Sequence, residues 1–215
     1  MNQRRWGAIL SYVNIIATIV VGLVYTPIML RLLGQSEYGL YSLVGSIVGY
    51  LSVLDMGLGD TVVRYTARNR ADGTKKKEAE LNGLFLFVYS IIGLVALVVG
   101  FILYANIDNL FGRTLSIGEM HRARIMMLLL IFNFALSFPL SIFSSIMNAY
   151  ERFIFLRVTN ILRVVLNPLL VLPFLFWGYG SVMMVVVSTA LNFACLLANM
   201  FYCLKFLHVH FARGH

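Results

Sequence analysis

Residues 81–104 read LNGLFLFVYSIIGLVALVVGFILY, a stretch without one Asp, Glu, Lys or Arg. Its inner part, IIGLVALVVGF at 91–101, is apolar at odd and even positions alike. A membrane β-strand would alternate between apolar and polar residues instead. About 20 apolar residues cross a bilayer core roughly 30 Å thick as an α-helix, which satisfies its own backbone hydrogen bonds in lipid. The stretch therefore predicts a transmembrane helix.

Further stretches of the same character lie on both sides of it. They cover 7–33, 39–63 with a helical extension toward Arg68, 125–147, 158–177 and 182–204. Together with 81–104 they predict an all-α, polytopic membrane bundle of about six transmembrane helices. Only short loops and ends remain, so residues 1–215 are interpreted as a single transmembrane domain without a soluble part.

The composition agrees with this fold class and excludes others. Hydrophobic residues make up 60% of the 215 residues, charged residues only 12%, and the mean hydropathy is +0.85. A soluble domain carries about 25% charged residues, so a soluble enzyme is excluded. The net charge of +8 could indicate nucleic acid binding. The basic residues nevertheless lie in short runs between apolar stretches, which predicts no nucleic acid partner.

The distribution of Lys and Arg predicts the orientation. Cytoplasmic loops carry an excess of these residues. If the N-terminus lies in the cytoplasm, just four of the 17 Lys and Arg fall on the opposite side, namely Arg31, Arg113, Arg122 and Arg124. We therefore expect both ends to be cytoplasmic. Arg4 and Arg5 precede an apolar run that is too long for a signal peptide, so the first span is expected to stay uncleaved.

Charged residues inside the spans are the candidate functional groups, because a charge in hydrocarbon costs about 2.5–3.5 kcal/mol on insertion scales. In the second span, Asp60 and Arg64 are spaced to pair on one helix face, and Asp55 lies deeper without a cation one turn away. We expect Asp55 to line a cavity. Asp60 and Arg64 either line a cavity too or mark the membrane interface. Arg163 in the fifth span either snorkels to the interface or lines a cavity with Asn160 and Asn167.

Other signals point to packing. Gly45 and Gly49 have the small-xxx-small spacing that allows close helix approach, and the Asn residues of the spans are typical interhelical hydrogen-bonding groups. Cys195 and Cys203 are about 12 Å apart along a helix, too far for a disulfide. The histidines of the tail, His208, His210 and His215, predict an interfacial tail rather than a metal site. We expect no cofactor and no metal.

Three strings resemble a known family when they are taken together. They are LGQSEYGLY at 33–41, LDMGLG at 54–59 and NAYERF at 148–153. A Gly-x-x-x-Tyr-Gly turn after the first span, followed by Asp-x-Gly-x-Gly in the second, resembles the polysaccharide flippases of the multidrug/oligosaccharidyl-lipid/polysaccharide exporter superfamily. The likeness extends from about Arg5 to Phe206.

The resemblance implies export of a lipid-linked oligosaccharide, such as an O-antigen unit on undecaprenyl pyrophosphate, across the bacterial inner membrane by alternating access. Family members have twelve to fourteen helices in two lobes, and this chain is similar to the N-terminal six-helix lobe. We expect a second six-helix lobe or a homodimer as partner. An anionic diphosphate would be met by Arg64 and Arg163, with Arg31 opposite, while Asp55 and Asp60 pair with these cations or carry a proton.

Alternative functions remain open at this stage. A multidrug and toxic-compound extrusion type antiporter would share the architecture and use Asp55 for a cation. An inactive half-transporter fragment is a second alternative. An enzyme is not expected: GLGD at 57–60 matches an intramembrane aspartyl protease string, but Asp55 and Asp60 point about 140° apart around a helix and no Tyr-Asp string supplies a partner.

Overall fold

The structure is a computed structural model that describes residues 3–55, 57–71 and 75–211, with only the backbone described at Asp55. This part of the chain is mostly helical, without strands. The helices are α1 (Gln3–Gly49), the 3-10 helix η1 (Tyr50–Asp55), α2 (Leu58–Ala71), α3 (Lys75–Ala105), α4 (Ile107–Phe111), α5 (Ile117–Ala149), α6 (Phe153–Phe176) and α7 (Ser181–Phe206).

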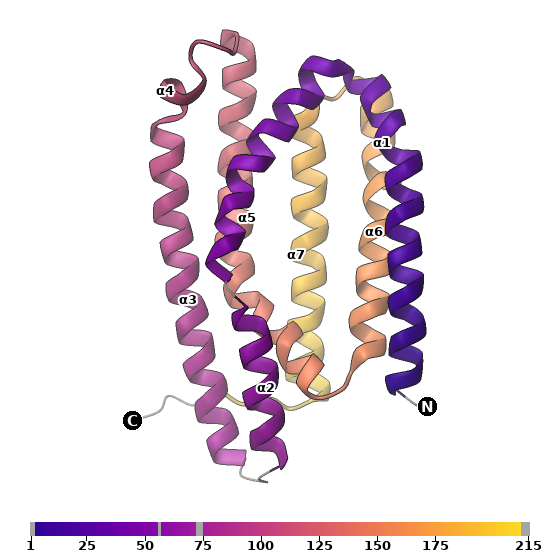
Figure 1. Cartoon of the computed structure of the whole chain (residues 1–215), viewed down its shortest axis with the longest axis vertical. Coiled ribbons are helices and arrows are strands. Elements are labelled where there is room, and N and C mark those ends of the chain that lie inside the picture. The colour runs from indigo at the N-terminus through magenta and orange to yellow at the C-terminus, as the bar shows by residue number, and fades with distance from the viewer. Residues whose placement is uncertain (1–2, 56, 72–74, 212–215) are drawn as a thin grey trace.

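The predicted all-α membrane bundle is confirmed. Five helical runs are long and apolar enough to cross a membrane. The first of them, Gln3–Ala71, reverses direction near Gly34 and returns toward the end of the bundle where it began, so the described chain passes along the bundle six times (Figure 1). We call the end that contains Gln3, Tyr150 and Phe206 the terminal face, and the opposite end, with Gly34 and α4, the far face.

The reversal depends on one residue. Gly34 has φ 79° and ψ 165°, whereas the rest of α1, including Pro27, continues as helix. A positive φ is accessible to glycine without the steric cost that a Cβ atom brings. The turn lies just beyond the predicted end of the first span at Leu33, in the string that carries the family resemblance.

The predicted continuous helix over 39–63 is wrong in its second half. The α-helix ends at Gly49, tightens into η1, and resumes at Leu58 after Gly57, whose φ is 74°. Asp60 and Arg64 therefore start a new helix and are both exposed. The ion pair that their spacing allowed is absent among the described residues, where neither side chain takes part in a salt bridge.

Helix α5 lies at the centre and packs against α3, α7, α2 and α1. A Cβ atom at Gly93 of α3 would lie 2.5 Å from the Ala135 carbonyl oxygen of α5, and one at Gly100 would lie 2.6 Å from Ile131. The close approach predicted at Gly45 and Gly49 is wrong, because nothing lies within 4 Å of a Cβ atom at either position. Tight contacts between helices are made instead by α3 with α5, and by α1 with α6, where a Cβ atom at Gly7 would lie 2.6 Å from Phe153.

Candidate functional site

Polar side chains along α5, α6 and α7 meet in the middle of the bundle. Asn192 of α7 is the centre of this network: its amide nitrogen donates to Asn133 Oδ1 at 2.8 Å and to Ser137 Oγ at 2.9 Å, both on α5. Asn133 stands halfway along α5 (117–149), so this contact lies deep in the apolar part of the bundle. Amide bonds of this kind connect transmembrane helices.

Arg163 of α6 joins the same network. Its Nη1 donates to Asn192 Oδ1 at 3.0 Å. The residue lies about 15 Å from the start of α6 at Phe153, at 1.5 Å per residue. The side chain is half-buried, and no carboxylate of the described residues lies within salt-bridge distance. A guanidinium group therefore stands well inside a helix that is able to span a membrane, with an amide as its partner and no carboxylate of the described residues to neutralise its charge.

A cavity of about 350 Å³ opens beside this guanidinium. Asn167 of α6 and Ser188 of α7 complete the polar wall, with a hydrogen bond from Asn167 Nδ2 to Ser188 Oγ at 3.2 Å. Val21 and Tyr25 of α1 form the other side. The described lining thus offers one cation, several amide and hydroxyl groups, and no carboxylate, which suits an anionic, hydrogen-bonding ligand.

The structure separates Arg163 from the three other candidate residues whose side chains it describes. Arg163 lines the cavity. Asp60 and Arg64 are exposed on α2, which packs on α3 and α5, and Arg31 is exposed near the far-face end of the first pass. None of these three lines a pocket together with Arg163 in the described part of the chain. The side chain of Asp55 lies outside the described residues.

The far face contains a different arrangement, in which charges neutralise one another. Glu37, just after the Gly34 reversal, has its carboxylate 2.7 Å from Arg122 Nε of α5. The same carboxylate accepts hydrogen bonds from the backbone nitrogen and the hydroxyl of Ser181, at 3.2 and 2.6 Å, and so caps the start of α7. Glu37 therefore connects the turn at Gly34 with α5 and with the start of α7.

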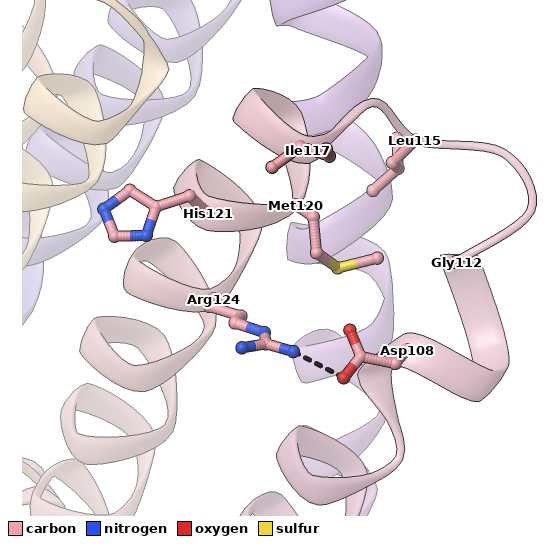
Figure 2. Close-up of a pocket in the computed structure, with 7 residues that line it drawn as sticks. All are labelled: Asp108, Gly112, Leu115, Ile117, Met120, His121 and Arg124. Atoms are coloured by element: carbon pink, nitrogen blue, oxygen red, sulfur yellow. Dashed lines mark hydrogen bonds and ion pairs between the residues drawn. The ribbon is translucent and has the colours of Figure 1, made fainter.

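A second cavity, also of about 350 Å³, lies at the far face between α4 and the start of α5. Figure 2 shows its inner wall, where Arg124 reaches Asp108 and forms an ion pair, while the ring of His121 points away from that pair. Both charged side chains are about half exposed, at 42% and 58%. Because its cation is already paired, this cavity offers less to an anion than the one beside Arg163.

Sequence reasoning grouped Asn133 and Asn192 with Asn residues that mostly join helices, one or two of which contact a polar ligand, and did not single out Ser137 or Ser188. A signal for them exists: Ser188, Asn192 and Asn199 recur at helical spacing on α7, as do Asn133, Ser137 and Ser144 on α5. Asn199 indeed donates to Ser144 Oγ at 2.9 Å. No cluster of the described residues could hold a metal ion, and His215 lies outside them. Both cysteines are free, as predicted.

Fold and cavity together define a multi-pass membrane protein with a polar site between its helices. Comparison with protein families agrees: residues 5–213 match the family described as polysaccharide biosynthesis protein, so the chain belongs to that family. No curated protein and no solved structure matches the chain. Membership supports a role in transport of polysaccharides or lipid-linked sugars.

Proposed function

We propose that this chain takes part in moving a lipid-linked oligosaccharide across a bacterial inner membrane by alternating access. The observation that carries the proposal is Arg163, a half-buried guanidinium well inside a helix that is able to span a membrane, without a carboxylate partner in the described residues. A diphosphate headgroup cannot cross hydrocarbon unaided, because burying an unpaired charge is prohibitive. A guanidinium fork that matches two phosphate oxygens lowers that cost.

The other cavity groups fit the sugar part of such a cargo. The amides of Asn133, Asn167 and Asn192 donate and accept hydrogen bonds, and Tyr25 adds an aromatic surface. The absence of Asp and Glu from the described lining argues against a cation or drug antiporter, which would need a carboxylate there. The proposed role is therefore transport of an anionic lipid-linked glycan rather than of a cation.

A second six-helix unit completes this proposal, either further along the same polypeptide or on a partner chain. The cavity beside Arg163 lies between α1, α5, α6 and α7, and a second unit would enclose it from the remaining side. The excess of Lys and Arg on the terminal face supports a cytoplasmic position for that face. Rocking of the two units would then expose the cavity to either side of the membrane.

The test is a glycan-export assay in cells that depend on this protein, with Arg163→Gln, Arg163→Lys and the matched control Arg157→Gln, which removes a charge from α6 outside the cavity. We expect surface glycan to fall at least tenfold with Arg163→Gln, to recover partly with Arg163→Lys, and to change less than twofold with the control. Normal export by Arg163→Gln, or resistance to cationic drugs that depends on Arg163, would refute the proposed cargo.

A further inference from the structure

A third cavity, of about 250 Å³, lies at the terminal face and has no role in the proposed transport site. Three segments that are distant in sequence form it: the first two turns of α3, the turn after α5 at Tyr150, and the tail 207–210. The tail is held in place, since the Val209 nitrogen donates to the Cys203 carbonyl at 3.3 Å and the Phe211 ring packs on Phe143, 5.7 Å between centroids. The pocket is therefore closed by packed chain rather than by a loose end.

One side of this cavity is basic. Lys75, His208 and His210 line it. Arg70 stands close by, with its guanidinium carbon 4.0 Å from the centre of the Tyr150 ring and a hydrogen bond to the Ala149 carbonyl at 3.0 Å. Among the described residues, Lys75 and the two histidines share the lining with a single carboxylate, that of Glu78, while Arg70 lies just outside the lining and interacts electrostatically with Glu151. The balance favours an anionic ligand.

The other side offers hydrogen-bond acceptors. Glu78 accepts a hydrogen bond from the Tyr150 hydroxyl, and burial together with this bond raises the pKa of Tyr150. One turn deeper on α3, Asn82 is 1% exposed, and its Oδ1 is buried without a hydrogen-bond partner. Unsatisfied buried acceptors are uncommon and costly, so this oxygen requires a donor. Beside Lys75 and two histidines, a neutral hydroxyl is a better donor than a further ammonium group.

From these two sides we infer that the terminal-face pocket binds a polyol phosphate, a phosphate ester whose alcohol part carries free hydroxyl groups. Lys75 and the histidines of the tail contact the phosphate, while Asn82 and Glu78 accept hydrogen bonds from the hydroxyl groups. The same chemistry is offered by the phosphoglycerol headgroup of an anionic membrane lipid and by soluble glycerol phosphate. The site is separate from the cavity beside Arg163 and is independent of the proposed transport cargo.

The experiment measures binding to the full chain in detergent. The probes are dihexanoyl-phosphatidylglycerol, glycerol 3-phosphate and inorganic phosphate, with dihexanoyl-phosphatidylethanolamine as the ammonium counterpart. We expect phosphatidylglycerol or glycerol phosphate to bind at least about tenfold more tightly than inorganic phosphate and phosphatidylethanolamine, because each hydroxyl adds a bond to a buried acceptor. Binding of the lipid alone identifies a membrane headgroup, and binding of both identifies a site open to soluble esters.

Matched variants locate the ligand. Lys75→Gln should weaken binding about tenfold or more, whereas Lys76→Gln, which removes the same charge from an exposed neighbour outside the pocket, should change it less than twofold. Asn82→Leu should abolish the preference for the glycerol ester over inorganic phosphate. Equal losses in the two lysine variants, tighter binding of the ethanolamine lipid, or no binding of any polyol phosphate would overturn the inference. Because Lys75 is exposed, its variant tests the site even if Asn82→Leu fails to fold.

Discussion

Arginine side chains have different partners in the cavity at the middle of the bundle and at the far face. At the far face Arg122 and Arg124 each have a carboxylate within salt-bridge distance, on Glu37 and Asp108. In the middle, Arg163 has the amide of Asn192 and no carboxylate among the described residues. The paired arginines fasten helix ends together, while the charge of Arg163 remains available to an anion that enters the cavity.

The largest expected effect comes from giving Arg163 a carboxylate. Asn192→Asp keeps the size of the side chain and places a negative charge on the atom that now accepts from Arg163. Binding of a lipid diphosphate should fall about tenfold to a hundredfold, since bonds to charged groups contribute about 1.5–3 kcal/mol. Titration of the purified chain with undecaprenyl diphosphate measures this.

The control for that variant is Asn192→Ala, which removes the same amide without adding charge. It should change diphosphate affinity less than about threefold. If Asn192→Asp binds as tightly as the unmodified chain, an internal carboxylate does not compete with the ligand and the contrast between the two regions has no functional meaning.

The fold could be predicted from the sequence, but the difference between the paired arginines of the far face and Arg163 in the cavity could not. Hydropathy predicted the spans because each must cover the bilayer core. The Gly-x-x-x-Tyr-Gly pattern that begins at Gly34 predicted the turn after Leu33. Which polar groups meet depends on helix rotation and packing, so the contact of Arg163 with Asn192 needed the structure. The break at η1 was missed because its sequence, YLSVLD, lacks proline and glycine, and the glycines beside it, Gly49, Gly57 and Gly59, are also compatible with a transmembrane helix.

The candidate residues illustrate the same limit. Asp60 and Arg64 satisfy the i, i+4 rule for a surface pair, yet both side chains are exposed and lie apart from the cavity. The glycine pattern misled in a similar way: GSIVG at 45–49 has the packing spacing but faces open space, whereas Gly93 and Gly100, seven residues apart, contact α5. Spacing defines a face of a helix, and the structure decides what that face meets.

The second prediction concerns Glu37, the most buried carboxylate of the far-face ion pairs, whose side chain is 20% exposed. Glu37→Gln removes the charge that Arg122 and the start of α7 require, so the free energy of unfolding should fall by about 1–3 kcal/mol. The decrease is measured as a lower thermal unfolding midpoint in detergent. Glu80→Gln removes a carboxylate without a partner in the described structure and should leave the midpoint nearly unchanged, so equal shifts would contradict this role.

The third prediction concerns the pair in Figure 2. Asp108 and Arg124 are both about half exposed, so the pair should contribute no more than about 1 kcal/mol. Asp108→Arg should lower the unfolding midpoint slightly, and the double exchange Asp108→Arg with Arg124→Asp should restore it. A double exchange that remains as destabilised as the single variant would show that the contact is not electrostatic.

The smallest effect is expected from an exposed pair at the terminal face. A hydrogen bond from the Arg4 guanidinium, with smaller help from its charge, lowers the pKa of Glu151 below its ordinary value of 4.5. A lowered carboxyl pKa stabilises the fold above that ordinary value and loses its contribution as the pH falls through the lowered one.

The difference in unfolding midpoint between the unmodified chain and Glu151→Gln should therefore be small and constant above about pH 5.5, and should disappear as the solution becomes more acidic. Added salt should also reduce it, because the pair is exposed. If the difference in unfolding midpoint grew toward low pH, the change would be opposite to the expected one and would contradict the lowered pKa of Glu151.

The most direct test of the whole account is the affinity of undecaprenyl diphosphate for the purified chain, compared between the unmodified protein, Arg163→Gln and Arg157→Gln. An anion site at Arg163 predicts that Arg163→Gln weakens binding at least about tenfold, while Arg157→Gln stays within twofold. Equal affinities of all three proteins for the diphosphate would contradict it.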